Sequence, residues 1–398
     1  MLNTGVPIIE SIFSFFTSNY IILALFLTII VYHILFSLTR DSNYRRILKN
    51  IDDPKGVKLS DLNHIPLINV IMPAWKEGKT FESCLLNISR LNYPNLKVIV
   101  NAGGSDETLQ IANSFRKFEN FTIIYQEQGG GKIKAINDCL NYISDGIVCI
   151  LDSDNLLTDK LLLKMIYPLI NGKEDIVIAP IAPHTSILNS DLVIYSYVNR
   201  YSEFRHKFTR YTIGFGSNAC INYHVFKLLG KFSEHKMLDD GRVTGIDLSS
   251  KGFKTYKLID HKMQSYTYPT GFSTYLHQNL RWIENFLYYS IKNRKIKLIK
   301  FVGLTIVSFS LLIFPFFLFF NVYIFLIGIS ILLSIYLKRI RKILFYKITD
   351  TSNSVKIKAI FYLKLILFIY FDNIINIIAS FEILFYRKAY KRRKNLIP

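Results

Sequence analysis

Long apolar runs at the two ends of the chain enclose a more polar middle part. Residues 20–38 form a near-continuous apolar run of 19 residues, which is long enough to cross a bilayer as one helix. Residues 301–337 contain no charged residue and are too long for one ordinary span, and Pro315 and Asn321 bracket a turn in that run. The pattern therefore predicts an N-terminal anchor and, near the C-terminus, a transmembrane hairpin of two helices.

The apolar segment at residues 359–385 is ambiguous. It carries Lys364, Asp372 and Glu382, and a basic tail follows it. If that tail lies on the same side of the membrane as the other basic clusters, the segment cannot be a single span. We favour a segment that lies along the membrane interface, and a span that breaks the charge rule stays as the alternative.

The middle of the chain alternates short apolar runs with helix-like stretches. The first four expected strands cover residues 68–73, 97–100, 122–125 and 147–151. Two later strands are expected at residues 176–179 and 253–258. Strand–helix–strand alternation repeated four times predicts an α/β fold with a mostly parallel sheet flanked by helices. An amphipathic, aromatic helix over residues 270–291, directly before the hairpin, is expected to lie on the membrane face.

Positive charge is concentrated beside the apolar runs. The chain of 398 residues has a formal net charge of +20. The clusters comprise Arg40, Arg45, Arg46 and Lys49; Lys292, Arg294, Lys295, Lys297 and Lys300; and Lys338, Arg339, Arg341 and Lys342. The positive-inside rule then places the middle domain in the cytoplasm, as part of a multi-pass protein of the cell membrane that contacts membrane lipids. This placement argues against nucleic acid as the partner, and the four cysteines, without Cys-x-x-Cys spacing, are expected to be reduced.

Two carboxylates follow the fourth predicted strand. Asp152 and Asp154 are one residue apart at its carboxyl end, where an open α/β sheet binds its ligands. Mg²⁺ or Mn²⁺ held between two such carboxylates and a nucleotide diphosphate would suit that position. Taken alone, an Asp-x-Asp pair is more often an ordinary turn.

Other candidate groups are spread along the domain. A glycine-rich loop at residues 101–106 could cradle an anion or sit against a nucleotide base, or be an ordinary strand-to-helix turn. Lys132 and Lys134 could neutralise phosphates or merely solvate a helix face. A second acidic pair, Asp239 and Asp240, lies about ninety residues after the first.

Together these residues resemble membrane-integrated family 2 glycosyltransferases with a GT-A fold, the group of hyaluronan, chitin and cellulose synthases and ceramide glucosyltransferases. Four motifs carry the resemblance: Ile71-Met72-Pro73-Ala74-Trp75-Lys76-Glu77, Asp152-Ser153-Asp154, Asp239-Asp240, and Gln278-Asn279-Leu280-Arg281-Trp282. Gly131-Lys132 before Ala135-Ile136-Asn137 also resembles the family pattern. The similarity covers residues 69–282 and departs from it at Asn101-Ala102, at Lys76 and around Gly241.

The resemblance implies a role for each matched position. Asp152 and Asp154 would hold Mg²⁺ or Mn²⁺, and Asp240 would be the general base. The implied nucleotide-sugar-binding residues are Pro73, Glu77, Asn101, Asp106, Lys132, Asp152, Asp239, Gln278, Arg281 and Trp282. The expected enzyme is an inverting hexosyltransferase that moves a sugar from a nucleotide-sugar donor, with a UDP-sugar expected, to a glycan or lipid acceptor.

The sequence is compatible with three different functions. Polysaccharide synthesis is favoured, single-sugar transfer to a membrane lipid is the alternative, and a non-catalytic subunit of the same fold is the third. Whether the protein forms a homo-oligomer is left open. The expected parts are an anchor at residues 1–40, a connector at 41–67, the GT-A domain at 68–268, an interfacial helix at 269–297, a hairpin at 298–338 and a basic C-terminal part at 339–398.

Overall fold

The protein divides into two compact units. The computed structural model describes residues 20–49, 53–128, 130–172, 174–204, 211–212, 218–232, 240–259, 262–292, 297–349 and 357–385. The membrane unit comprises residues 1–49, 198–205 and 296–380, and the sheet unit comprises residues 50–197, 206–295 and 381–398.

The sheet unit is built on an eight-stranded sheet with the strand order β3-β2-β1-β4-β9-β6-β10-β8. Its strands are β1 (Ile68–Trp75), β2 (Leu96–Gly103), β3 (Phe121–Tyr125), β4 (Ile147–Ile150), β6 (Ile176–Ile178), β8 (Tyr211–Thr212), β9 (Ala219–Asn222) and β10 (Thr255–Lys257). The pairs among β1 to β4 and between β6 and β10 are parallel, while β8 and β9 run antiparallel to their neighbours. A second small sheet joins β5 (Asn155–Leu156), β11 (Met263–Ser265) and β7 (Ile181–Pro183). The predicted mostly parallel α/β sheet is confirmed.

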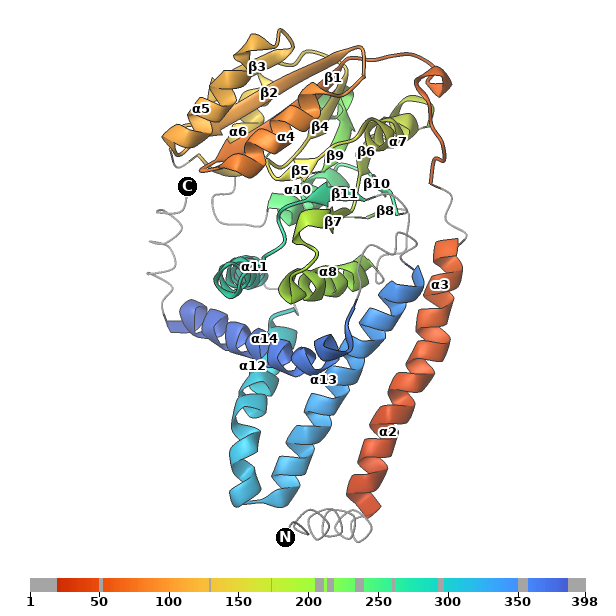
Figure 1. The fold of residues 1–398 in the computed structure, drawn as a ribbon, viewed down its shortest axis with the longest axis vertical. Helices are drawn as coiled ribbons and strands as arrows, with labels where there is room; N and C mark the ends of the chain where they lie inside the picture. The colour runs from red at the N-terminus through yellow and green to blue at the C-terminus, as the bar shows by residue number, and fades with distance from the viewer. Residues whose placement is uncertain are drawn as a thin grey trace. The chain divides into compact units, whose positions relative to one another are not determined.

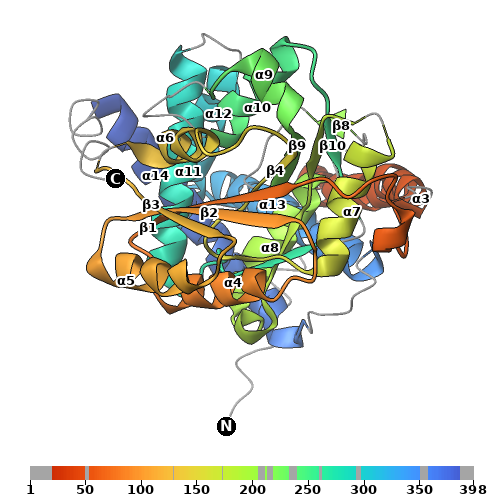
Figure 2. The ribbon, with the colours of Figure 1, turned by 90° about the horizontal axis from the view of Figure 1, so that it is seen from above.

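Helices cover both faces of this sheet (Figures 1 and 2). One face carries α4 (Lys79–Ser89), α5 (Asp106–Ser114) and α7 (Asp159–Ile170), whose apolar residues join the larger core cluster. The other carries α6 (Gly131–Leu140), α9 (Tyr223–Leu229) and α10 (Asp240–Ser250), which pack in the second cluster. Two further helices are α8 (Asp191–Phe204) and α11 (Phe272–Lys292). The two cores bury both faces of the sheet, which explains why its strands read as continuous apolar runs.

β1 is longer than its sequence predicts. The expected strand ends at Pro73, because proline donates no hydrogen bond to a ladder. The observed strand continues to Trp75 and pairs with β2 over its whole length, whereas its pairing with β4 ends at Ile71. The proline is tolerated because β1 has a partner on only one side at that point.

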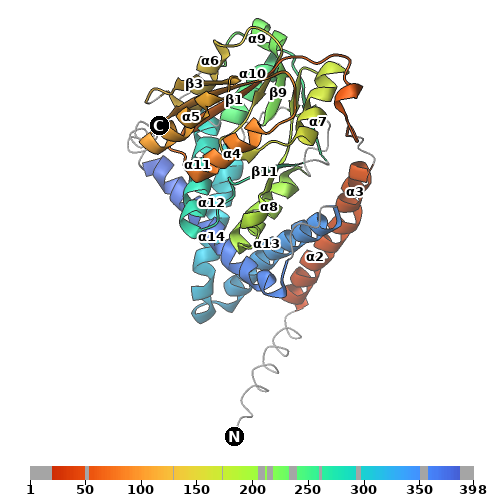
Figure 3. The same ribbon diagram turned by 45° about the horizontal axis from the view of Figure 1, so that its top comes forward.

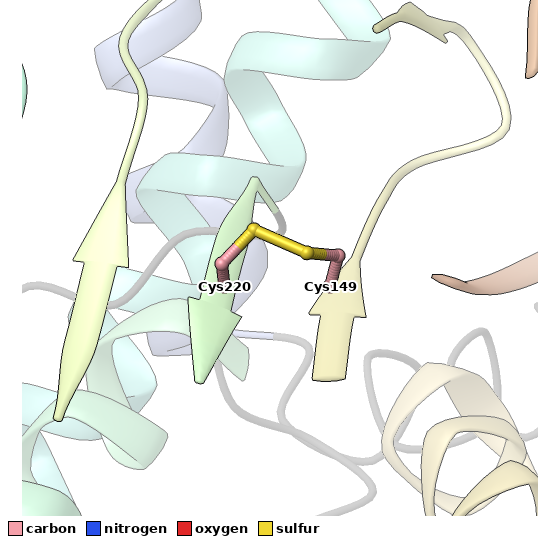
Figure 4. Close-up of a disulfide and its surroundings, with 2 residues drawn as sticks. All are labelled: Cys149 and Cys220. Carbon is pink, nitrogen blue, oxygen red and sulfur yellow. A yellow bond between two sulfur atoms is a disulfide. The ribbon is translucent and has the colours of Figure 1, made fainter. Parts of the chain in front are cut away.

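The expectation of four reduced cysteines is wrong for two of them. Cys149 of β4 and Cys220 of β9 are directly opposite in the antiparallel register and form a disulfide (Figure 4). Their Cα atoms are 4.1 Å apart, as in the narrow pairs of an antiparallel ladder. Sequence reasoning missed this pair because it predicted no strand at the position of β9. Cys84 and Cys139 are free and buried.

The membrane unit contains four helices that are long and apolar enough to cross a bilayer. Its elements are α2 (Tyr20–Phe36), the π-helical turn η1 (Ser37–Asp41), α3 (Ser42–Lys49), α12 (Lys297–Ile313), the 3₁₀ turn η6 (Phe314–Phe319), α13 (Val322–Thr349) and α14 (Ala359–Phe385). α12 and α13 are joined through η6, so the turn falls where Pro315 and Asn321 predict it. α2 lies beside α13 (Figure 3).

The ambiguous C-terminal segment is one helix, α14, which crosses α12 and α13 in Figure 1. Ser308 of α12 donates a hydrogen bond to Asn373 over 2.9 Å, and Arg339 of α13 pairs with Asp372 at 2.7 Å. Adjacent residues of α14 thus meet two different helices, as a crossing requires. Because Asp372 and Asn373 are paired with these neighbouring helices, these two polar groups do not need to face lipid.

A buried ion pair joins η1, the turn that follows α2, to α13. The Arg341 guanidinium contacts Asp41 through Nε at 3.0 Å and Nη2 at 3.3 Å, and its Nη1 lies 3.1 Å from His33 Nδ1. The Arg341 Cζ atom also lies 4.0 Å from the centre of the Phe36 ring. With both charged side chains buried, the pair fixes which faces of α2 and α13 meet.

Replacing one partner of this pair should destabilise the membrane unit more than replacing both. Arg341→Met leaves the Asp41 carboxylate buried without its cation, which should cost about 3–5 kcal/mol. The double variant Asp41→Asn with Arg341→Met removes both charges and should recover a large part of that loss. Thermal unfolding of the four proteins of this cycle in one detergent measures the coupling; additive losses would contradict a specific pair.

Two glycines offer a matched test of the turn that leads into β4. Gly146 (φ +84°) and Gly252 (φ +87°) both adopt the left-handed region, but a Cβ on Gly146 would lie 2.2 Å from the Leu67 carbonyl oxygen, whereas Gly252 faces open space. Gly252→Ala should cost about 1 kcal/mol of conformational strain. Gly146→Ala adds a backbone clash and should lower the melting temperature by several degrees more than Gly252→Ala. Equal shifts in thermal unfolding would contradict the steric argument.

Candidate active site

The candidate groups gather where neighbouring parallel strands end. β1 and β4 are adjacent and parallel, so Glu77, just after β1, and Asp152 to Asp154, just after β4, meet at one edge of the sheet. Ser153 donates a hydrogen bond to Glu77 Oε1 over 2.8 Å, which ties the two strand ends together. The Asp-x-Asp pair therefore lies at the carboxyl end of β4, where the sequence predicts it.

Lys132 and Lys134, in the first turn of α6, have different partners. Lys132 forms an ion pair with Asp152 Oδ1. Lys134 instead pairs with Asp138 at 3.0 Å and Glu127 at 3.3 Å, on the surface of its own helix and loop. Of the two, Lys132 is therefore the cation that lies at the carboxylate cluster.

Asp154 is the most perturbed acid of the cluster. Burial is the largest cause that raises the pKa of its carboxyl, and the Asp152 and Glu77 charges add to it. Lys132 and a hydrogen bond with Thr267 lower the pKa, and the net result is about 7. Burial also raises the pKa of Glu77, while the Ser153 hydrogen bond lowers it. Asp154 Oδ1 is buried and has no hydrogen-bond partner among the described residues. An unpaired carboxylate oxygen beside a second carboxylate fits a divalent cation, which prefers such oxygen ligands.

The backbone after β11 connects this cluster to α11. Tyr266 N donates to the Asp154 carbonyl oxygen over 2.9 Å, and Gln278 Nε2 donates to the Thr267 carbonyl oxygen over 2.9 Å. Gln278 therefore holds the short segment that contacts Asp154. Arg281, which is exposed, and Trp282, which is half-buried, follow it at the three- and four-residue spacing that shares one helix face. Sequence reasoning missed Ser153 and Thr267, which are small polar residues that no spacing pattern marks.

The turn after β1 is held in a strained conformation. Lys76 has φ +57°, a region that glycine and asparagine adopt at lower cost than lysine. Its N–H donates to the Gly103 carbonyl over 3.0 Å, and Glu77 N donates to Thr108 Oγ1 over 2.7 Å. These bonds fix the direction in which Glu77 leaves the strand. An asparagine at this position would suit the left-handed backbone better than the lysine does.

The remaining predicted residues lie at the ends of β1 and β2 or outside the described side chains. Pro73 is opposite Asn101 in the β1–β2 register, and Asn101 is fully buried. Asp106 is the exposed first residue of α5. Asp240 is the first residue of α10, but its side chain and the whole of Asp239 lie outside the described residues. The structure thus groups Glu77, Lys132, Asp152 and Asp154 and leaves the proposed base untested.

Comparison with known proteins supports a glycosyltransferase domain. Residues 69–230 match the family model described as glycosyl transferase family 2. The chain carries a family 2 glycosyltransferase domain. The solved mannosyltransferase PcManGT from Pyrobaculum calidifontis is similar in fold to the whole chain, with a TM-score of 0.52 at 16% identity, covering 92% of this chain and 99% of that one. The GT-A fold predicted from the sequence is thereby confirmed.

Two curated relatives match the glycosyltransferase domain over short stretches. Poly-beta-1,6-N-acetyl-D-glucosamine synthase of Staphylococcus epidermidis is 29% identical over 101 residues, which is 25% of this chain. Glycosyltransferase GlyG of Streptococcus pneumoniae is 28% identical over 115 residues, 28% of this chain and 38% of that protein. The match spans only 24% of the length of the staphylococcal synthase.

The raised pKa of Asp154 predicts how pH and Mn²⁺ act together on stability. An unfolded aspartate titrates near ~4, so between about pH 4 and 7 the folded protein binds more protons and loses stability as the pH rises. Mn²⁺ should reverse this loss because it stabilises the ionised carboxylate. The melting temperature should therefore increase on adding Mn²⁺ more strongly at pH 8 than at pH 6.

The matched variants for this prediction are Asp154→Asn and Glu82→Gln. Asp154→Asn should abolish both the Mn²⁺ shift and the loss of stability between about pH 4 and 7. Glu82→Gln, which neutralises an exposed carboxylate of α4, should leave both as in the wild type. A full Mn²⁺ shift in Asp154→Asn would contradict the assignment of this residue as a metal ligand.

Proposed function

We propose that the protein is an inverting, metal-dependent glycosyltransferase that moves a sugar from a nucleoside-diphosphate sugar to a membrane-associated acceptor. The observation that carries the proposal is the unpaired, buried Asp154 oxygen beside the Lys132–Asp152 pair, at the carboxyl edge of a family 2 domain. A UDP-sugar is the first donor to test.

The donor side of the site supplies charge for a departing diphosphate. Asp152 and Asp154 would hold Mg²⁺ or Mn²⁺, which when bound acts as a Lewis acid that stabilises the negative charge of the leaving group. The mannosyltransferase similar in fold was solved with GDP-Man and Mn²⁺. Lys132 lies at Asp152 and would compensate phosphate charge once the carboxylate turns to the cation. Glu77, held by Ser153, keeps the two strand ends in place.

The acceptor side requires a base opposite the leaving group. The acceptor hydroxyl must lose a proton as its oxygen attacks the anomeric carbon, and Asp240 at the start of α10 would take that proton. A single displacement of this kind inverts the anomeric configuration. Gln278 would hold the segment at Thr267. Arg281 and Trp282 on the same helix would bind phosphate and sugar respectively.

The membrane unit suggests where the acceptor is found. Four helices are apolar enough to span a bilayer, and basic clusters flank them. By the positive-inside rule, the glycosyltransferase domain would face the cytoplasm. The staphylococcal relative is named as a polysaccharide synthase, and we accordingly propose polysaccharide synthesis. Transfer of one sugar to a lipid is the second candidate, because the same helices could anchor a lipid acceptor.

Asp240→Asn should abolish transfer and leave donor binding nearly unchanged. The amide keeps the size of the side chain but cannot accept the proton, so a loss of at least about 100-fold in kcat is expected. Asp247→Asn on the same helix is the matched control and should retain activity. Substantial turnover by Asp240→Asn, with donor affinity measured in parallel, would contradict the base assignment.

Product analysis tests the proposed function as a whole. Purified protein in lipid is supplied with Mn²⁺ and a panel of radiolabelled nucleotide sugars, and lipid-extractable label is separated from polymeric label. Label in high polymer would support polysaccharide synthesis, and label in one small lipid band would support the second candidate. No label and no nucleotide release from any donor would contradict both and favour a non-catalytic subunit.

A further inference from the structure

The contacts between α14 and α12 lie much closer together on α12 than on α14. Ser308 of α12 donates a hydrogen bond to Asn373 over 2.9 Å, and the hydroxyl oxygens of Thr305 and Ser380 lie 3.0 Å apart. From one contact to the other the chain advances seven residues, about 10 Å, along α14 but only three residues, about 4.5 Å, along α12. α14 therefore crosses α12 steeply instead of running beside it.

The contacts between α14 and α13 have the same geometry. Tyr336 Oη donates to the Tyr362 carbonyl oxygen over 3.1 Å, and Arg339 pairs with Asp372 at 2.7 Å. Ten residues of α14, about 15 Å, thus correspond to three residues of α13, about 4.5 Å. Along α14 the contacts move toward the basic end of both partner helices, and the crossing can be followed in Figure 1. α14 therefore does not advance along the hairpin toward the η6 turn.

Arg339 fixes the level of this crossing along α13. It belongs to the basic cluster that directly follows the uncharged run at residues 301–337, where the predicted span ends. Its partner Asp372 is the middle residue of α14. In a helix that crosses the bilayer, the middle residue lies about 15 Å from either surface. The pair between Arg339 and Asp372 is therefore incompatible with a spanning α14, although length and composition alone would allow one.

The outer face of α14 is apolar. Ile360, Leu363, Leu367 and Ile374 are all exposed, and their spacing places them on one side of the helix. A row of large apolar side chains of this kind marks a surface that is covered by a partner or by lipid. A helix that lies at the membrane interface buries such a face among the acyl chains.

We propose that α14 does not cross the membrane but lies in the leaflet at which α13 ends, with its exposed apolar face in contact with lipid acyl chains. The spanning helices of the described chain are then α2, α12 and α13. The basic tail that follows α14 lies on the same side as the basic clusters beside the other spans, as the positive-inside rule requires. This inference is independent of the reaction that the protein performs.

Cysteine labelling in sealed, oriented membrane vesicles tests the side on which the tail lies. The reporter variants are Asn395→Cys in the tail, Ser60→Cys in the sheet unit and Phe320→Cys in the turn between η6 and α13. An impermeant maleimide should label Phe320→Cys from one side and the other two variants from the opposite side. The wild type, whose own four cysteines are buried, is the background control.

Two labelling patterns would overturn the proposal. Labelling of Asn395→Cys from the same side as Phe320→Cys, and of Ser60→Cys from the other side, would show that α14 spans. Labelling of all three variants from one side would show that the hairpin itself does not span.

Nitroxide labels test the depth of α14 directly. In bilayers, a label at Leu367 should lie no deeper than one at Ile360, seven residues earlier on the same face, as measured by collisions with O₂ and a water-soluble nickel chelate. In a spanning α14 the label at Leu367 would lie about 10 Å deeper. Tyr20 and Leu27 of α2, also exposed and seven residues apart, are the matched control and should show that difference. Labels on α14 that are shielded from both reagents would indicate cover by a second copy of the chain and overturn the lipid contact.

Discussion

The close grouping of three carboxylates at one sheet edge is the constraint on which the candidate active site depends. Like charges this close cannot all remain ionised without compensation, and the fold compensates them unequally. Lys132 pairs with Asp152, Ser153 donates to Glu77, and Asp154 keeps an unpaired oxygen and a pKa raised to about 7. The site is therefore arranged at a cost in stability that a bound cation would offset.

Backbone register, rather than contact between the motifs, brings these groups together. Parallel pairing of β1 with β2 and β4 carries three strand ends to one edge, and the connections after them are short and fixed. Lys76 adopts a left-handed conformation there because its N–H is committed to Gly103 and the next residue to Thr108. These two hydrogen bonds therefore fix the direction of Glu77, at the cost of local backbone strain at Lys76.

The sequence predicts the parts of the fold that periodicity and strand-end chemistry determine. The four strands that lead to Asp152 and the hairpin of α12 and α13 follow from apolar runs and the parallel rule. β9 and the Cys149–Cys220 pair do not, because a short strand of small residues has no period and antiparallel register is a tertiary property. The contact of Gln278 with Thr267 also depends on packing between segments that no spacing relates.

The disulfide and the basic flanks of the membrane helices favour different compartments, and the burial of the two sulfur atoms reconciles them. Disulfides are typical of oxidising compartments, whereas the basic clusters favour a cytoplasmic domain. Cys149 and Cys220 lie inside the sheet with no more than 1% of either residue exposed. Thiol–disulfide exchange requires access of an attacking thiolate to sulfur, so a reductant reaches this pair only when the sheet opens. Its redox state therefore reports the stability of the pairing between β9 and β4, the strand that Asp152 and Asp154 follow, more directly than it reports the compartment.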